Sequence, residues 1–138
     1  MSNALFGKTE DSLAASIQMR LLRQNVVSSN IANAETPGYK AKKLDFEEAL
    51  RRAIDINGAG KMHSSHNEHY PVNGGSISRV RADIYDNPDV NINPDGNTVD
   101  LEKEMAKLSE NSILYKAALE LINKKMSMMR YAVSEGGR

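Results

Sequence analysis

The chain has 138 residues, with 18 basic and 18 acidic side chains and no cysteine. This length corresponds to one domain, and the balanced charge gives no excess positive field to attract the phosphates of a nucleic acid. The lack of cysteine excludes disulfides and thiolate chemistry.

The first predicted element is a helix over residues 10–34. Apolar side chains recur there at helical spacing in two stripes, although Gln24 and Ser28 interrupt the first of them. The first stripe is Ala14, Ile17, Leu21 and Ile31, and the second is Ala15, Met19, Leu22 and Val26. Of these, Ile17 and Leu21 are the residues that we expect to pack against another helix of the same chain.

A cluster of stop signals ends this helix, with the sequence Asn-Ile-Ala-Asn-Ala-Glu-Thr-Pro-Gly-Tyr-Lys at residues 30–40. Pro37 disfavours a helical conformation at Thr36, and the Pro-Gly pair favours a tight turn in which Gly38 takes a positive φ. A Pro-Gly pair alone is ordinary chain punctuation, whereas the whole string is far more specific. Its signature residues are Asn30, Asn33, Thr36, Pro37, Gly38 and Tyr39.

A short second helix is predicted at about 45–55. Asp45 and Glu48 fit a reciprocal capping pattern, and apolar residues then recur on one face. These are Phe46, Ala49, Leu50, Ala53 and Ile54. The basic run before this helix, Lys40, Lys42 and Lys43, is expected on a solvated turn.

The middle of the chain, residues 57–97, is rich in Gly, Asn, Ser, His and Pro, and helical periodicity disappears. Alternation of apolar and charged side chains predicts a strand within 78–86, and 90–92 is a second candidate. Residues 94–97 predict a turn, after which Asn97 or Thr98 would cap the next helix.

Three histidines, His63, His66 and His69, lie within this segment. Imidazole is a common metal ligand, but the spacing matches no known zinc pattern and the neighbouring glycines do not form a rigid scaffold. A solvated polar loop is the favoured interpretation, so we expect no metal and no cofactor.

The C-terminal helix, predicted at 99–133, has the strongest periodicity in the chain. Its apolar residues alternate at spacings of four and three, which is the pattern of a coiled coil. This predicted seam consists of Leu101, Met105, Leu108, Ser112, Tyr115, Leu119, Ile122, Met126, Met129 and Val133. The first helix is the natural partner, so we expect the two ends of the chain to pack as an antiparallel hairpin.

A second stripe on the same helix is displaced by one residue, or roughly 100° around its axis. It consists of Leu114, Ala118, Leu121, Met128 and Ala132. A helix with two apolar stripes has two neighbours, and we assign Leu114, Leu121 and Met128 to an interface with another subunit.

No catalytic site is predicted. The serines have no nearby His or Lys arranged as a base, and no phosphate-binding loop or nucleophile elbow is present. Most carboxylates, Glu104 among them, lie in the first turns of predicted helices, where the helix dipole favours negative charge.

The string at 30–40, together with Asp-Gly-Asn-Thr-Val-Asp-Leu-Glu-Lys-Glu-Met at 95–105, resembles the bacterial flagellar axial proteins, the family of rod, hook and hook-junction subunits. The resemblance implies one mainly α subunit over 1–138. Its terminal helices, 10–34 and 99–133, would form an inner coiled-coil domain, and 35–98 would form the turn, the short helix and a loop or β insert. The implied function is a structural subunit of the proximal rod, which polymerises through these helices to transmit torque for motility.

The resemblance also implies partners and a location. The partners would be further copies of the chain, the rod proteins FlgC, FlgF and FlgG, the adaptor FliE and the membrane-ring protein FliF. Such proteins are exported through the flagellar type III apparatus to the periplasmic rod without signal cleavage. The N-terminus agrees, because no basic region followed by an apolar run is present.

Two other functions stay open at this point. A soluble coiled-coil adaptor or export chaperone would bind one partner helix and would need one apolar face. A metal-dependent hydrolase built on the three histidines would need a tightly bound metal ion.

Overall fold

The computed structural model describes residues 7–55, 80–88 and 92–135. In chain order its elements are α1 (Lys8–Ala32), β1 (Lys42–Asp45), α2 (Glu47–Asp55), β2 (Asp83–Asp86) and α3 (Leu101–Glu135). The chain is mainly helical, as predicted, and the three predicted helices lie within two residues of the observed bounds.

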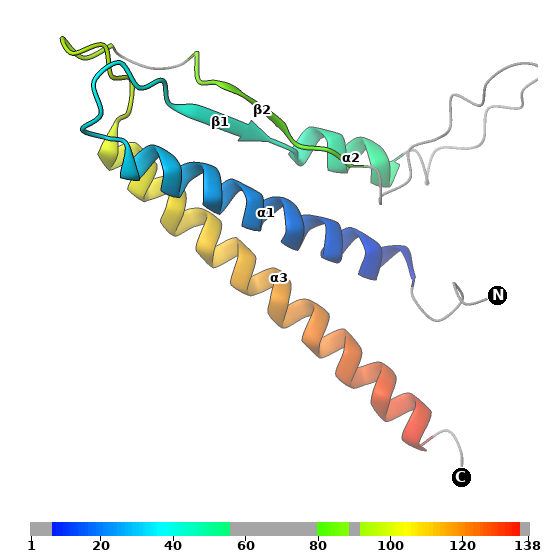
Figure 1. Ribbon diagram of the computed structural model, residues 1–138. Coiled ribbons are helices and arrows are strands. Elements are labelled where there is room, and N and C mark those ends of the chain that lie inside the picture. The colour runs from blue at the N-terminus through cyan, green and yellow to red at the C-terminus, as the bar shows by residue number, and fades with distance from the viewer. Residues whose placement is uncertain (1–6, 56–79, 89–91, 136–138) are drawn as a thin grey trace, which may run out of the picture.

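The two long helices form an antiparallel hairpin that is closed at the end of α1 and the start of α3 (Figure 1). Three contacts fix how they are aligned: Asn30 with Glu104, Arg20 with Asn111, and Glu10 with Lys125. Since α3 has 35 residues and α1 has 25, α3 continues beyond the start of α1. The predicted hairpin is therefore confirmed.

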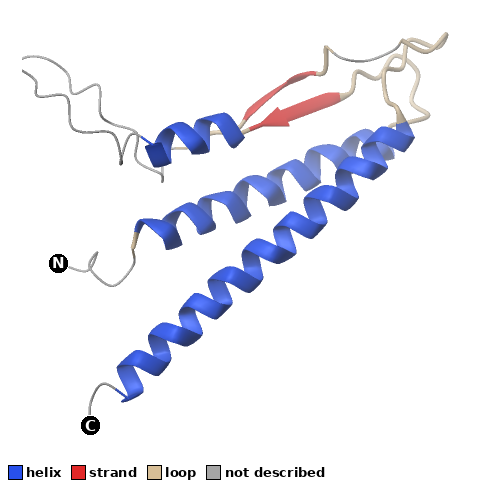
Figure 2. Ribbon diagram, turned by 180° about the vertical axis from the view of Figure 1, so that it is seen from behind, coloured by secondary structure: helices blue, strands red, loops and turns tan. Residues whose placement is uncertain are grey.

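A two-stranded antiparallel sheet and α2 lie along the hairpin beside α1 (Figure 2). The strands pair from Lys42 with Asp86 to Asp45 with Asp83. Within the predicted strand at 78–86, only 83–86 form a strand among the described residues. Of the second candidate, 90 and 91 lie outside the described residues, and Ile92 is not in a strand.

The strand β1 corrects the expectation that Lys42 and Lys43 lie on a solvated turn. A four-residue strand with three charged side chains has little sequence signal of its own, and pairing with β2 supplies its stability. Its one apolar residue, Leu44, is buried against the hairpin.

The capping prediction for α2 was also wrong. Asp45 is the last residue of β1, where its carboxylate accepts a hydrogen bond from the Tyr85 hydroxyl, and the helix begins two residues later. Glu48 instead binds Arg51 and Arg52, whose hydrogen bonds lower its pKa to about 2.

Arg23 fastens the sheet and α2 to α1. Its guanidinium donates to the carbonyl oxygen of Leu44 at 2.8 and 3.2 Å, and it forms an ion pair with Glu47. The same group lies 4.7 Å from the ring centroid of the buried Phe46, a cation–π distance. One arginine therefore holds both β1 and the start of α2.

Candidate assembly interface

The signature turn after α1 packs against the loop before α3. Gly38 has φ +72° and Gly96 has φ +80°, so both adopt the left-handed conformation that favours glycine. The amide of Gly38 donates to the carbonyl oxygen of Asp95 at 3.0 Å, which joins the two loops. The predicted positive φ of Gly38 and the predicted turn at 94–97 are both confirmed.

Asn97 binds the loops together from the inside. Its side chain is fully buried, and its Nδ2 lies 2.8–3.0 Å from the carbonyl oxygens of Asn33, Ala34 and Thr36. These carbonyls lie at the end of α1 and in the turn after it, where no further helical turn supplies an N–H group to donate to them. Asn97 thus closes the exit of α1.

The expected role of Asn97 or Thr98 as the cap of α3 is therefore corrected. The cap is Asp100, whose carboxylate accepts a hydrogen bond from the amide of Lys103 at 3.1 Å. The Thr98 hydroxyl instead accepts from the amide of Ala41 at 2.8 Å and fixes the chain just before β1.

Asn30 joins α1, β1 and α3 at a single buried point. Its Nδ2 donates to the carbonyl oxygen of Lys42 at 2.7 Å and to the carboxylate of Glu104 at 2.9 Å. Its Oδ1 accepts from the Lys42 amide at 2.9 Å and from the Tyr39 hydroxyl at 3.2 Å. All four hydrogen-bonding positions of this side chain are used, which explains how an amide is tolerated with no exposed surface.

Glu104 was expected to be one of several carboxylates that the helix dipole favours in a first helical turn. It is instead buried, and besides Asn30 it binds the ammonium of Lys107 at 2.7 Å. The helix dipole accounts for a negative charge near this position, but the partner on α1 accounts for its burial.

The face of α3 that contacts α1 differs from the predicted seam at every second position. This buried seam, whose members are buried or half-buried, is Glu104, Leu108, Asn111, Tyr115, Ala118, Ile122, Lys125 and Met129. Leu108, Tyr115, Ile122 and Met129 were predicted. The other four each precede a predicted residue by one position.

The other residues predicted to pack within the hairpin lie at the edge of the buried seam or are exposed to solvent. Leu119 is half-buried, as is Ile17 on α1. Met105 is 56% exposed, and Leu101, Met126 and Leu21 are exposed as well. Their assignment to packing within the chain is corrected, because polar residues with partners on α1 take the central positions.

Two of these polar residues bind α1 directly. The Nδ2 of Asn111 donates to the carbonyl oxygen of Arg20 at 2.8 Å, and Lys125 forms an ion pair with Glu10 at 3.1 Å. With Glu104 and the small Ala118 they recur every seven residues. A polar residue at a seam position costs stability but fixes the register of a helix pair.

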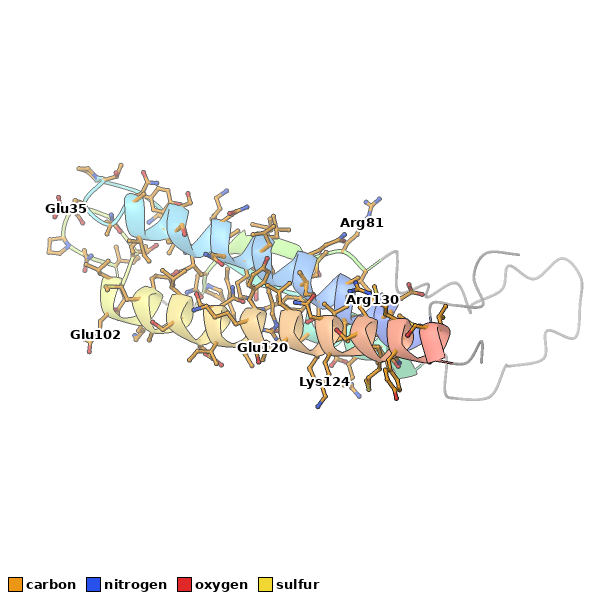
Figure 3. The ribbon with its side chains drawn as sticks, turned by 90° about the horizontal axis from the view of Figure 1, so that it is seen from below. Glu35, Arg81, Glu102, Glu120, Lys124 and Arg130 are labelled. Carbon is orange, nitrogen blue, oxygen red and sulfur yellow. The ribbon has the colours of Figure 1, made fainter. Side chains whose placement is uncertain are left out.

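Leu114, Leu121 and Met128, which were assigned to a subunit interface, are exposed in the single chain, the last two by 57% and 54%. Ala118, from the same predicted stripe, is buried in the seam. On the outer side of α3, Glu102, Glu120 and Lys124 point away from the hairpin together (Figure 3). Leu114, Leu121 and Met128 lie beside the seam, whereas the exposed Ile113, two residues after Asn111, lies opposite it.

The three histidines lie outside the described residues. Within residues 7–55, 80–88 and 92–135, no group of three or more His, Asp or Glu is placed to hold a metal ion. In the same part of the chain no helix has the length and apolar character to cross a membrane.

Comparison with known proteins identifies relatives of the whole hairpin. The family model described as flagella basal body rod protein matches residues 18–40, which cover the second half of α1 and the signature turn. The flagellar basal body rod protein FlgB of Cereibacter sphaeroides is 37% identical over 120 residues, which are 87% of this chain and 89% of the relative.

The FlgB proteins of Proteus mirabilis and Bacillus subtilis are each 31% identical. The first aligns over 124 residues, with 87% of this chain and 89% of the relative covered. The second aligns over 133 residues, with 96% and 98% covered. The similarity thus includes both long helices and the loops that join them.

Proposed function

The chain belongs to the flagellar basal body rod protein FlgB family, and from this premise we propose that it is a structural subunit of the proximal rod whose terminal helices polymerise with those of neighbouring subunits. One observation supports polymerisation above all others. Exposed apolar side chains lie on both flanks of the α1–α3 seam, and a single partner helix would cover only one flank.

The two flanks follow from helix geometry at 100° per residue. Leu121 is three positions after the seam residue Ala118, which places it about 60° to one side. Met105 is one position after Glu104, which places it about 100° to the other side. Leu114 and Met128 share the first flank with Leu121, and Met126 shares the second with Met105.

Burial of these flanks gives a reason for assembly. Full burial of an exposed Leu or Met side chain contributes roughly 1.5–3 kcal/mol, and the five flank residues, which are partly exposed, would each contribute a share of this when neighbours cover them. Packed helices of many subunits would then carry torque along the rod. The surrounding subunits would be further copies of the chain and FlgC, FlgF and FlgG, with FliE and FliF at the base.

This function places the chain in the periplasmic part of the basal body, reached through the flagellar type III apparatus. The polar seam residues Glu104, Asn111 and Lys125 suit export in an unfolded state. A helix pair held partly by polar contacts opens at a lower free-energy cost than an all-apolar pair. The role is structural and needs no cofactor.

The test is the incorporation of Leu121→Glu into basal bodies, compared with Ser127→Glu, which adds the same charge at an exposed polar position of α3. We expect both purified variants to melt within a few degrees of the parent, because both positions are exposed. Only Leu121→Glu should be missing from purified basal bodies, and those cells should not swim.

Normal incorporation of Leu121→Glu would contradict polymerisation through two flanks. It would favour an adaptor or export chaperone with one partner helix, since such a protein tolerates a charge on its free face. Absence of the unaltered chain from basal bodies would contradict the rod function itself.

A further inference from the structure

Three methionine side chains are exposed on α3, and all three lie on its flanks. Met105 is exposed by 56%, Met126 by 37% and Met128 by 54%. Met105 and Met126 share the second flank, and Met128 lies on the first flank with Leu121. Methionines therefore make up three of the five flank residues that neighbouring subunits would cover.

The other methionines of the described residues are partly covered by the chain itself. Met19 on α1 and Met129 in the buried seam are both half-buried. Met128 and Met129 are adjacent in sequence, but they point in directions that differ by about 100° around the helix axis. The chain thus contains exposed and covered methionines that can be compared with each other. Met1 and Met62 lie outside the described residues.

The composition makes methionine the side chain that a mild oxidant attacks. The chain has seven methionines and neither cysteine nor tryptophan. Hydrogen peroxide converts the thioether of methionine to a sulfoxide. The sulfur lone pair attacks one peroxide oxygen as the O–O bond breaks, the proton on that oxygen moves to the departing hydroxide, and water is released. Because peroxide must touch the sulfur atom, the exposed methionines react first.

A sulfoxide changes what the flank positions can do. The thioether is apolar and flexible, which suits packing against a neighbouring helix, whereas the sulfoxide is polar. In the free chain, water donates hydrogen bonds to the sulfoxide oxygen. A neighbour that covers the flank removes this water, and a buried acceptor without a donor costs free energy. One turn along α3 from Met105, the Ser109 hydroxyl already donates to the Met105 carbonyl oxygen at 3.0 Å.

We propose that Met105, Met126 and Met128 form an oxidation site that controls assembly: peroxide converts them to sulfoxides in the free subunit, and the modified subunit is excluded from the rod. This inference rests on the proposed function, because the flanks matter only if neighbouring subunits cover them. In the assembled rod the same side chains are buried. Oxidation therefore acts on subunits before assembly and spares those already in place.

Peroxide footprinting compares the free and the assembled subunit. The purified chain and purified basal bodies are treated briefly with dilute hydrogen peroxide, and tandem mass spectrometry gives the oxidised fraction at each methionine. In the free chain the three flank methionines should react faster than Met19 and Met129, and the melting temperature should not change. In basal bodies the rates of the flank methionines should fall to those of Met19 and Met129 or below.

A competition between two chains in one cell tests the effect on assembly. Cells express equal amounts of the parent chain and of Met105→Leu/Met126→Leu/Met128→Leu, whose side chains have a similar volume and no sulfur. Without peroxide the two chains should enter basal bodies equally. During peroxide exposure, oxidised parent chains should enter about ten-fold less often than unoxidised ones, because burial of an unpaired polar group costs on the order of that factor. The Leu variant should then outnumber the parent chain.

The matched control is Met19→Leu/Met129→Leu, which removes the two half-buried methionines and keeps the three on the flanks. In competition with the parent chain, its share of basal bodies should not change with peroxide. A gain for this control, or no gain for the flank variant, would overturn the oxidation site and leave the rod function standing.

The footprinting results separate the inference from the proposed function. Equal rates at all five methionines of the described residues in the free chain, or a lower melting temperature after brief oxidation, would overturn the flank site alone. Flank methionines that react as fast in basal bodies as in the free chain would contradict burial by neighbours, and the inference with it. Absence of the parent chain from basal bodies would contradict the rod function itself.

Discussion

The two ends of the hairpin are built differently. At the turn end, around Asn30, Asn97 and Glu104, buried side-chain groups are paired with one another or with the backbone. At the open end, Glu10 and Lys125 make one ion pair, and the second carboxylate oxygen of Glu10 has no hydrogen-bond partner. The chain thus completes its turn end alone and leaves the open end incomplete.

The number of segments that meet at each end explains this difference. The end of α1, the loop before α3 and the start of β1 converge at the turn end, so an asparagine there can reach several backbones. At Glu10, the ion pair across the hairpin comes from α3 alone, through Lys125. A region with few partners opens at low free energy, which is useful where a neighbouring subunit must bind.

The largest effect of a single substitution is expected for Asn97→Ala at the turn end. It removes the donor for the carbonyls of Asn33, Ala34 and Thr36 and the acceptor for the Val99 amide. We expect a loss of about 3 kcal/mol in the free energy of unfolding, because the Val99 amide and the Ala34 carbonyl lose their partner, while the carbonyls of Asn33 and Thr36 each keep one backbone donor. Urea unfolding of the purified chain measures this loss.

The matched control is Asn93→Ala, at an exposed asparagine of the same loop. Its effect should stay within about 0.5 kcal/mol. Similar losses for the two variants would mean that Asn97 is not what closes the turn end.

A smaller loss is expected for Glu104→Ala, about 2 kcal/mol. The substitution leaves Nδ2 of Asn30 with one acceptor, the Lys42 carbonyl, and leaves Lys107 without its ion pair. Glu104→Gln keeps an acceptor and should lose less. Glu102→Ala, in the same first turn but exposed, is the control for a simple effect of the helix dipole, and an equal loss there would contradict a specific role of Glu104.

Sequence reasoning predicted the elements that depend on local pattern. Apolar periodicity located both long helices within two residues, and Pro37 with Gly38 predicted the positive φ. These features follow from steric limits and spacing that act over a few residues. They can therefore be read without knowing which distant segments meet.

Sequence reasoning missed the features that depend on distant partners. Glu104, Asn111 and Lys125 share one position of a seven-residue repeat whose third member is Ala118, but a polar residue on an amphipathic helix usually indicates the solvent side. Their burial requires Asn30, the Arg20 carbonyl and Glu10 on the other helix. The seven-residue spacing was the available signal for these seam positions. It was overlooked because apolar residues one position later, such as Met105, have the same spacing.

Gly38→Ala tests the backbone strain at the turn end apart from side-chain contacts. An added Cβ would meet no atom within 4 Å, so the cost comes from the positive φ alone. We expect a loss of about 1 kcal/mol for Ala and less for Gly38→Asn, because Asn tolerates this conformation better. Urea unfolding of both variants checks the order, and a Gly38→Asn loss as large as the Ala loss would contradict strain as the cause.

The smallest effect concerns the open end and its response to acid. The pKa of Glu10 is lowered from its usual value by a backbone hydrogen bond and then by the Lys125 ammonium. A carboxylate with a lower pKa in the folded state stabilises the fold above its unfolded pKa, and this contribution is lost as the pH falls through the folded value. Below about pH 4.5, the open end should therefore loosen before the turn end.

Amide hydrogen exchange at neutral and acidic pH would show this difference, after correction for the intrinsic pH dependence of exchange. In the parent chain, protection around Glu10 and Lys125 should fall on acidification more than protection around Asn30. Glu10→Gln should have weak protection at the open end at neutral pH and little further loss in acid, because its side chain has no charge to neutralise. Equal loss of protection at both ends of the parent chain would mean that the hairpin opens as one unit, and the contrast between a complete end and an incomplete end would not hold in solution.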